Sequence, residues 1–214
     1  MRIKQLDQII GGKSKGLSNP GKMPCKAFNI PAAYCNIGAK LRQIIGSVCS
    51  ICYALKGRYV FPVVLIAMER RYERFIKGCN NERYIAAFAE LVTKQSPDYF
   101  RWFDSGDLPS LDCLIGIVKI AILTPNTKHW LPTREYKIVR DYIEKYGAFP
   151  PNLVVRVSIH MLGQNKRPKI PNVVFSGVAM GKGNTCQADQ NNHKCGPCRA
   201  CWDKRVKLIN YPKG

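Results

Sequence analysis

Acidic side chains are scarce in this sequence, which has 14 Asp and Glu against 34 Lys and Arg and a formal net charge of +20. The imbalance is strongest in residues 1–60, which hold ten basic side chains and a single acid, Asp7. A field of that sign attracts polyanions and speeds their association with the protein. We therefore expect a nucleic acid as partner, DNA above all, with an anionic small substrate as the alternative.

Long apolar runs are also missing. The longest candidate, Leu111–Leu123, is interrupted by Asp112, Gly116 and Lys119 and is shorter than the ~20 residues that a membrane span needs. The N-terminus, MRIKQLDQIIGGK, lacks the apolar block of a signal peptide. We expect a cytoplasmic protein with no membrane partner. Its 214 residues, 46% of them hydrophobic, suit one domain over 1–214 with a sizeable core.

From residue 62 onward, apolar segments of helical and strand character alternate. Helices are predicted over 62–77, 81–94, 111–123 and 134–146, with Ser110 and Thr133 as N-caps of the last two. Strands are predicted over 99–103, 128–131, 153–159 and 172–176. This alternation predicts an α/β fold with a parallel sheet covered by helices. Residues 1–60 look loop-rich, and 184–214 form a cysteine-rich segment.

Polar side chains follow each predicted strand. The carboxyl ends of parallel strands share one edge of the sheet, where α/β proteins place their sites. Five of these residues are candidate catalytic groups: Asp104, Asp107, Arg134, Glu135 and His160. Three hydroxyls are candidate cofactor contacts: Ser105, Thr133 and Ser158. Helix capping is the alternative role for Thr133 and Asp107, and internal ion pairs between Arg134 or Arg156 and the acids are the alternative for the charged groups.

The sequence has ten cysteines and no secretion signal, which favours metal ligation over disulfides. The sharper pattern is Cys186-x8-Cys195-x2-Cys198-x2-Cys201. Three thiolates on one tight turn suit a cubane iron–sulfur cluster, whose corner irons each take one sulfur. We predict a [4Fe–4S] cluster here, with Cys186 as fourth ligand and zinc as the alternative metal.

A second, looser cysteine pattern lies near the N-terminus. It reads Cys25-x9-Cys35-x13-Cys49-x2-Cys52 and predicts a second cluster or metal site on these four residues. In a sharper version only three of the cysteines bind, and one open iron takes a substrate or cofactor. The alternative for Cys25 or Cys35 is a small buried residue, and Cys113 is expected in the core.

Four motifs carry a resemblance to a known group: residues 49–59 (CSICYALKGRY), 100–107 (FRWFDSGD), 129–135 (HWLPTRE) and 195–202 (CGPCRACW). The chain resembles bacteriophage and prophage proteins labelled gene-product-eighty-eight-like, over about Met23 to Tyr211. That group is distantly similar to radical S-adenosylmethionine proteins. The similarity implies a partial (β/α) barrel, an adenosylmethionine-binding cluster on Cys35, Cys49 and Cys52, and an auxiliary cluster on the C-terminal cysteines. A phage origin would place it in the host cytoplasm.

The sequence is compatible with two functions. The first is an iron–sulfur enzyme acting on nucleic acid, either in the radical manner or by hydrolysis. In the hydrolytic version Asp104, Asp107, Glu135 and His160 hold a divalent ion and Arg134 holds a phosphate. The second is a non-catalytic, basic DNA-binding protein with a structural iron–sulfur or zinc site. Its aromatic residues would stack bases beside lysines; the candidates are Tyr34, Tyr53, Tyr59, Trp102 and Trp130.

Overall fold

In this computed structural model, which describes residues 1–12, 16–180 and 185–213, the core is one parallel β-sheet. Its six strands stand side by side in the order of the sequence, and every neighbouring pair is parallel. The strands are β1 (Ala27–Phe28), β2 (Tyr99–Trp102), β3 (Lys128–Thr133), β4 (Leu153–Ser158), β5 (Val174–Val178) and β6 (Leu208–Tyr211). The predicted α/β class and the parallel sheet are thereby confirmed.

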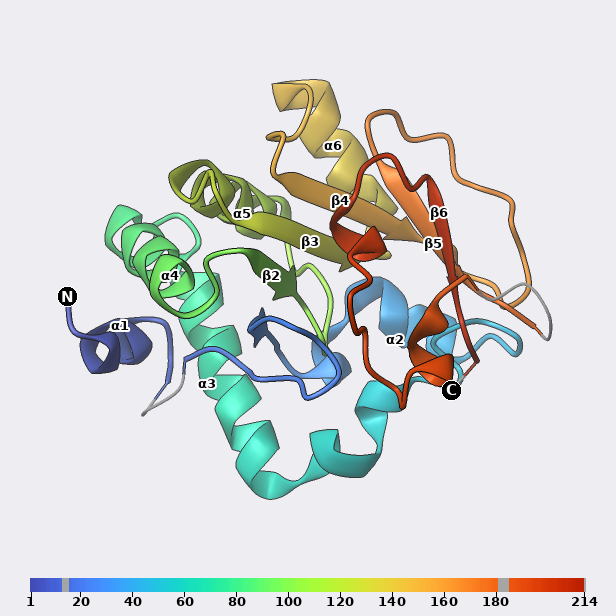
Figure 1. Cartoon of the computed structure of the whole chain (residues 1–214), viewed down its shortest axis with the longest axis horizontal. Helices are drawn as coiled ribbons and strands as arrows, with labels where there is room; N and C mark the ends of the chain where they lie inside the picture. The colour runs from blue at the N-terminus through green and yellow to red at the C-terminus, as the bar shows by residue number, and fades with distance from the viewer. Residues whose placement is uncertain (13–15, 181–184, 214) are drawn as a thin grey trace.

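Six α-helices lie within the described residues. They are α1 (Ile3–Ile9), α2 (Asn36–Arg42), α3 (Pro62–Gly78), α4 (Glu82–Gln95), α5 (Leu111–Leu123) and α6 (Tyr136–Tyr146). The last four match the predicted helices closely, and Ser110 caps α5 by accepting a hydrogen bond from the Cys113 N–H. Helices α4, α5 and α6 line up along one face of the sheet (Figure 1). No helix in the described ranges is both long and apolar enough to cross a bilayer.

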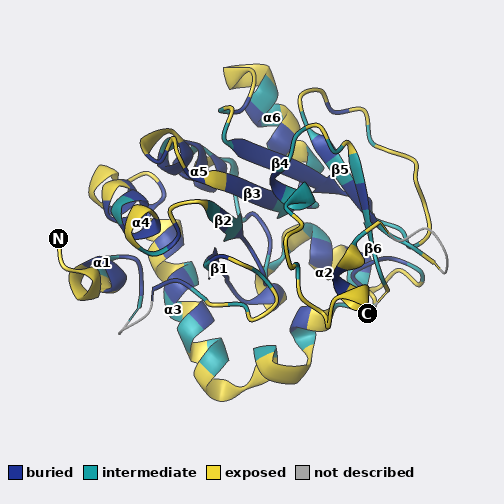
Figure 2. Cartoon of the chain, viewed as in Figure 1, coloured by how far each residue is buried: buried dark blue, intermediate teal, exposed yellow. Residues whose placement is uncertain are grey.

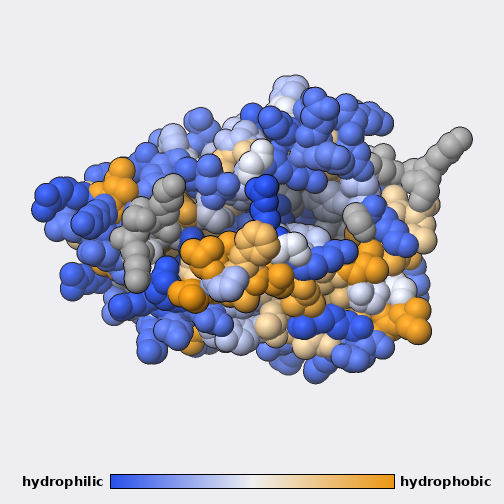
Figure 3. Space-filling view, turned by 90° about the horizontal axis from the view of Figure 1, so that it is seen from below, coloured by the Kyte–Doolittle hydropathy of each residue, from blue (hydrophilic) through white to orange (hydrophobic). Residues whose placement is uncertain are grey.

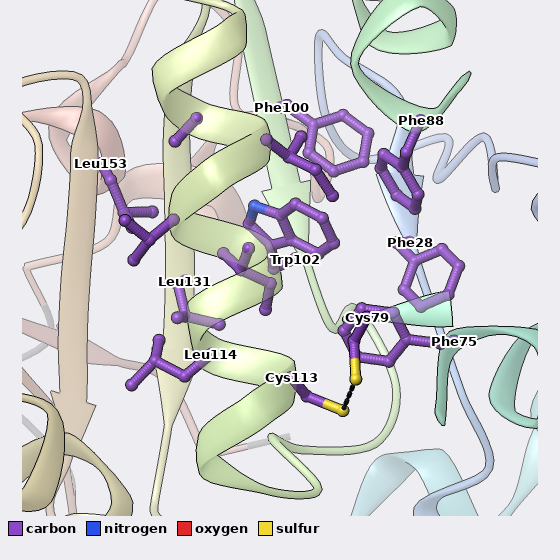
Figure 4. Close-up of a cluster of buried hydrophobic side chains, with 14 of the residues drawn as sticks. Phe28, Phe75, Cys79, Phe88, Phe100, Trp102, Cys113, Leu114, Leu131 and Leu153 are labelled. Carbon is purple, nitrogen blue, oxygen red and sulfur yellow. Dashed lines mark hydrogen bonds between the residues drawn. The ribbon is translucent and has the colours of Figure 1, made fainter. Parts of the chain in front are cut away.

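The main hydrophobic core lies between this helical layer and the sheet. Alternate strand residues point into it, among them Phe100, Trp102 and Leu131, and the ring of Phe88 from α4 stacks on Trp102 at 4.9 Å. Figure 2 shows the strands as the most buried part of the chain, and Figure 4 shows the aromatic cluster packed against α5. Burial of these large rings supplies most of the hydrophobic stabilisation.

The opposite face of the sheet is covered by the C-terminal segment. Its 3₁₀ turn η5 (Ala200–Trp202) lies over β3 and β4 (Figure 1). Arg156, fully buried on β4, donates to the carbonyl oxygens of Phe175, Val206, Ala200 and Asp203 at 2.9–3.3 Å. One guanidinium therefore ties the cysteine-rich segment to the sheet. The ion pair between Arg156 and an acid that the sequence suggested is absent from the described salt bridges.

Three features of the elements differ from the predictions or add to them. Residues 1–60 are loop-rich, as expected, but also contain the short elements α1, α2 and β1. Thr133 does not cap a helix over 134–146, because it is the last residue of β3 and α6 begins at Tyr136 with Glu135 as its N-cap. Strand β6 lies inside the cysteine-rich segment, where no strand was predicted. Residues 184 and 214 of that segment lie outside the described ranges.

Candidate functional site

The loop after β2 is a tight turn that buries two carboxylates. Phe103 has a φ of 48°, and Gly106 has a φ of 82°. A Cβ at Gly106 would lie 2.3 Å from the Ile30 side chain and 2.8 Å from its carbonyl oxygen, so only glycine fits. The turn thus brings Asp104 and Asp107, both buried, to the carboxyl edge of the sheet.

Asp104 is held by neutral donors from four separate segments. Its Oδ1 accepts from Ser18 Oγ at 2.9 Å, and its Oδ2 accepts from Tyr59 OH at 3.1 Å and Asn29 Nδ2 at 3.3 Å. Its backbone carbonyl accepts from Tyr53 OH at 2.7 Å. The carboxylate therefore organises the N-terminal segment around the end of β2.

Asp107, in the loop after β2, likewise accepts hydrogen bonds from another segment, here the end of β3. Oδ1 accepts from Thr133 Oγ1 and from the Leu108 N–H, both at 2.7 Å, and Oδ2 accepts from the Arg134 N–H at 2.9 Å. Burial raises the pKa of Asp107, while the Arg134 charge and these hydrogen bonds oppose the rise. The Asp107 carboxylate thus accepts three hydrogen bonds and links the loop after β2 to the end of β3.

Glu135 accepts a hydrogen bond from the first turn of helix α2. Its Oε1 accepts from the Ile37 N–H at 2.9 Å, in the first turn of α2, where free N–H groups need acceptors. Burial raises the pKa of Glu135, and the Ile37 hydrogen bond opposes that effect. Three predicted catalytic carboxylates, Asp104, Asp107 and Glu135, therefore accept hydrogen bonds from separate sets of donors.

His160 and the predicted hydroxyls lie along the same edge. The His160 ring stacks on Tyr136 at 4.1 Å, and its Nε2 is 3.2 Å from the Arg134 carbonyl oxygen; burial lowers its pKa. Ser158 Oγ is 3.2 Å from Ser176 Oγ. Ser105 Oγ is buried without a hydrogen-bond partner in the described part of the chain, which leaves it available to a ligand.

Three N-terminal cysteines gather beside these residues. A Cβ placed on Gly38 would lie 3.6 Å from Cys35 Sγ and 3.8 Å from Cys49 Sγ, so both thiols flank this position in α2. The pKa of Cys35 is raised mainly by burial and further by Asp107, Cys52 and Cys49, while Arg134 lowers it. The pKa of Cys49 follows the same pattern: burial and Cys52 raise it and Arg134 lowers it. We call Cys35, Cys49 and Cys52 the N-terminal thiol set.

Cys25 lies elsewhere, with the C-terminal cysteines. It packs with Trp130 and Trp202 in an apolar cluster that Cys201 joins, and the Cys195 N–H donates to the carbonyl oxygen of the neighbouring Lys22 at 2.9 Å. Burial raises the pKa of Cys25 to about 12, and Cys195 contributes to the rise. Cys25 was expected to group with Cys35, but the structure places it with the C-terminal cysteines instead.

The C-terminal thiol set comprises Cys25, Cys186, Cys195, Cys198 and Cys201. Burial is the main cause of the raised pKa of Cys195 and Cys201; Cys186 raises both further, and Cys198 adds to the rise at Cys195. A cavity of about 390 Å³ lies against Cys195 and Cys198 and is also lined by Gln187, Asn191 and Pro197. Within the described ranges no group of three or more His, Cys, Asp or Glu side chains is arranged to hold a single metal ion.

Each thiol set has an arginine that forms no ion pair with a carboxylate in the described structure. Arg134 lies by the N-terminal set, and its Nε is buried without a partner. Arg101, near the C-terminal set, stacks over Trp130 at 4.5 Å, and its Nε is likewise unpartnered. A guanidinium withdrawn from water favours a nearby negative charge. Arg101 was not predicted to be a site residue, although a cation within the aromatic strand sequence YFRW is unusual and could have indicated it.

Comparison with known proteins places these features in a family. A family model described as Gene product 88 matches residues 4–172. No curated protein and no solved structure matches the chain. The matched region contains the N-terminal thiol set and every strand-end residue from Asp104 to His160, and it ends before Cys186. Because the match spans well over half of the sequence, the chain belongs to the gene product 88 family.

Proposed function

We propose that this chain is an iron–sulfur enzyme of phage or prophage type that acts on nucleic acid, with a [4Fe–4S] cluster on Cys35, Cys49 and Cys52. The observation that carries the proposal is that three thiols lie beside Arg134, which forms no salt bridge in the described structure and whose charge is favoured by Cys49 as well as by Asp107. This group of residues lies at the carboxyl edge of a parallel sheet, the usual place for a site.

The chemistry of these residues fits a cluster. Burial raises the pKa of Cys35 and Cys49, so without a metal both are neutral thiols at pH 7. Ligation removes their protons, and the resulting negative charge is what the Arg134 guanidinium favours. Cluster ligands bind different irons, so they need not converge on one point as the ligands of a single ion do. Three ligands leave one iron open for a substrate or cofactor.

The sheet supports the radical version of this enzyme. Parallel strands in sequence order, with helices on one face, are what a partial (β/α) barrel requires. When bound, a reduced cluster would supply the electron that cleaves S-adenosylmethionine. The chain's own part is to bind and orient that molecule, and the unpartnered Ser105 hydroxyl is available as a contact. Thr133 and Ser158 already have internal partners.

The hydrolytic version has less support. A divalent ion would have to displace the donors that now occupy Asp104, Asp107 and Glu135. The C-terminal thiol set suits a second cluster in a structural role, because Arg156 and Trp202 anchor its segment to the sheet. A single zinc ion in that role has less support, since no three of these side chains in the described ranges are arranged to hold one ion. That structural site is also what the alternative function, a non-catalytic DNA-binding protein, would retain.

The test is the reductive cleavage of adenosylmethionine. Anaerobically reconstituted protein with dithionite and S-adenosylmethionine should form 5′-deoxyadenosine, and Cys49→Ala should abolish the product. Cys113→Ala is the matched control, because Cys113 is a buried residue of α5 whose Sγ donates to Cys79 Sγ at 3.4 Å (Figure 4) and which belongs to neither thiol set. Wild-type protein that carries a reduced cluster and forms no product would refute the radical mechanism.

A further inference from the structure

The longest apolar stretch near the N-terminal thiol set has one exposed side. Residues 59–68 read YVFPVVLIAM, and they form the end of η3 (Gly57–Val60) and the first turns of α3. Val63 is 75% exposed, Phe61 53% and Ile66 52%. A helix that is apolar on its outer face normally has a partner there.

This surface, which we call the apolar ridge, consists of Tyr53, Val60, Phe61, Val63 and Ile66. Figure 3 views the molecule from the side on which α3 begins and shows hydrophobic side chains gathered on this face, bordered by hydrophilic ones. Val60, Phe61, Val63 and Ile66 are neighbours in the chain or one helical turn apart, and Tyr53 packs beside Tyr59, so the exposed side chains of the ridge lie together.

The ridge is joined directly to the candidate site. Tyr53 follows Cys52 in the chain, and its hydroxyl donates to the Asp104 carbonyl oxygen at 2.7 Å. Tyr59, which precedes Val60, donates to the Asp104 carboxylate, and the Tyr53 and Tyr59 rings lie 5.7 Å apart. A molecule bound on the ridge would therefore lie beside the Asp104 turn and Cys52.

The charges around the ridge indicate an anionic occupant. Lys56 and Arg58 are exposed immediately before it, and the chain as a whole carries a net +20. Like charges of that size oppose pairing of two copies of the chain. Exposed aromatic rings beside cations are the usual platform for single strands, and apolar side chains such as Phe, Ile and Pro can wedge between bases.

We infer that the apolar ridge is a stacking wedge for single-stranded nucleic acid, which it unstacks next to the thiol set. Phe61 and Tyr53 stack on bases, Val63 and Ile66 hold the neighbouring step open, and Lys56 and Arg58 bind phosphates. The inference rests on the proposed function for the identity of the polymer, and it adds the surface that binds it. An unstacked base is what chemistry on a base requires.

The test uses a single-stranded DNA oligonucleotide that carries 2-aminopurine, whose fluorescence rises when it is unstacked. We expect binding of wild-type protein to raise the fluorescence, and Phe61→Ala to weaken binding about tenfold and remove the rise. Ile122→Ser is the matched control, because Ile122 is an exposed apolar residue at the end of α5 and should change neither. Lys56→Gln should weaken binding while the bound complex keeps its fluorescence rise.

Several results would overturn the inference. One is binding to vesicles with anionic lipids that Phe61→Ala abolishes while oligonucleotide binding stays intact. Another is a dimer in light scattering that Val63→Asp dissociates, because the ridge would then cover a second copy. Iron content distinguishes failure of the wedge from failure of the enzyme proposal. If the protein carries iron but its Phe61→Ala variant still binds and unstacks the oligonucleotide normally, only the wedge is refuted.

Discussion

His129 shows how much the surroundings of one side chain determine its chemistry. It is fully buried on β3, its Nδ1 accepts from Trp102 Nε1 at 3.3 Å, and its Nε2 lies 2.8 Å from Thr124 Oγ1. The Thr124 hydroxyl donates to the Ile120 carbonyl oxygen at 2.7 Å, so the histidine Nε2–H must be the donor of the second bond. Burial lowers the pKa of His129 to about 3, and the ring is neutral in the folded protein.

Stability should therefore depend on pH through this group. The unfolded histidine takes up a proton below its ordinary pKa of 6.5, and the folded one does not until about pH 3. Its contribution is full above pH 6.5 and is lost as pH falls, by about 1.4 kcal/mol per unit. Urea unfolding of wild type and His129→Gln between pH 7 and 4 measures the difference. Equal slopes in the two proteins would contradict this prediction.

The sequence placed the candidate site residues in the fold but did not reveal their hydrogen-bond partners. Asp104, Asp107 and Glu135 do lie at the carboxyl edge of the sheet, because strand ends can be placed from pattern alone. Their hydrogen-bond donors, such as Ser18 for Asp104 and Ile37 for Glu135, come from segments distant in the sequence that no local pattern reveals. The same holds for Cys25, because its neighbours come from the C-terminal segment, whose position against the sheet cannot be read from local sequence.

At the scale of elements, the long periodic helices α3, α4 and α5 were predictable and the short elements were not. Helix α2 and strands β1 and β6 have 7, 2 and 4 residues, too few to show a period. Their stability comes from tertiary partners instead, such as Glu135 for α2 and the neighbouring strand for β6.

Arg156 should determine whether the C-terminal segment stays on the sheet. Arg156→Met removes the donor to four carbonyl oxygens and leaves buried acceptors unpaired, which should cost more than about 2 kcal/mol. Urea unfolding measures the loss, and hydrogen exchange should quicken in residues 200–206 before it does in α5. Arg205→Met is the control, because Arg205 is an exposed residue of the same segment. An unchanged unfolding free energy in Arg156→Met would show that the segment is held by other contacts.

At the scale of the whole molecule, the charge excess should dominate affinity for nucleic acid. For a single strand, the logarithm of the binding constant falls with the logarithm of salt concentration, by about 0.7 per neutralised phosphate. We expect the double variant Lys56→Gln and Arg58→Gln to reduce that slope by about 1.4. Titrations at several salt concentrations, with Lys137→Gln on exposed α6 as control, give the slopes. Equal slopes would place the phosphate contacts elsewhere.

The most direct measurement is the iron and acid-labile sulfide content per chain of protein purified without oxygen. If both thiol sets hold clusters, about eight of each are expected, and Cys49→Ala should lose about four. A single cluster on the N-terminal set alone gives about four, all lost in that variant. Folded, oxygen-protected protein that contains no iron, or whose iron is unaffected by Cys49→Ala, would contradict the account.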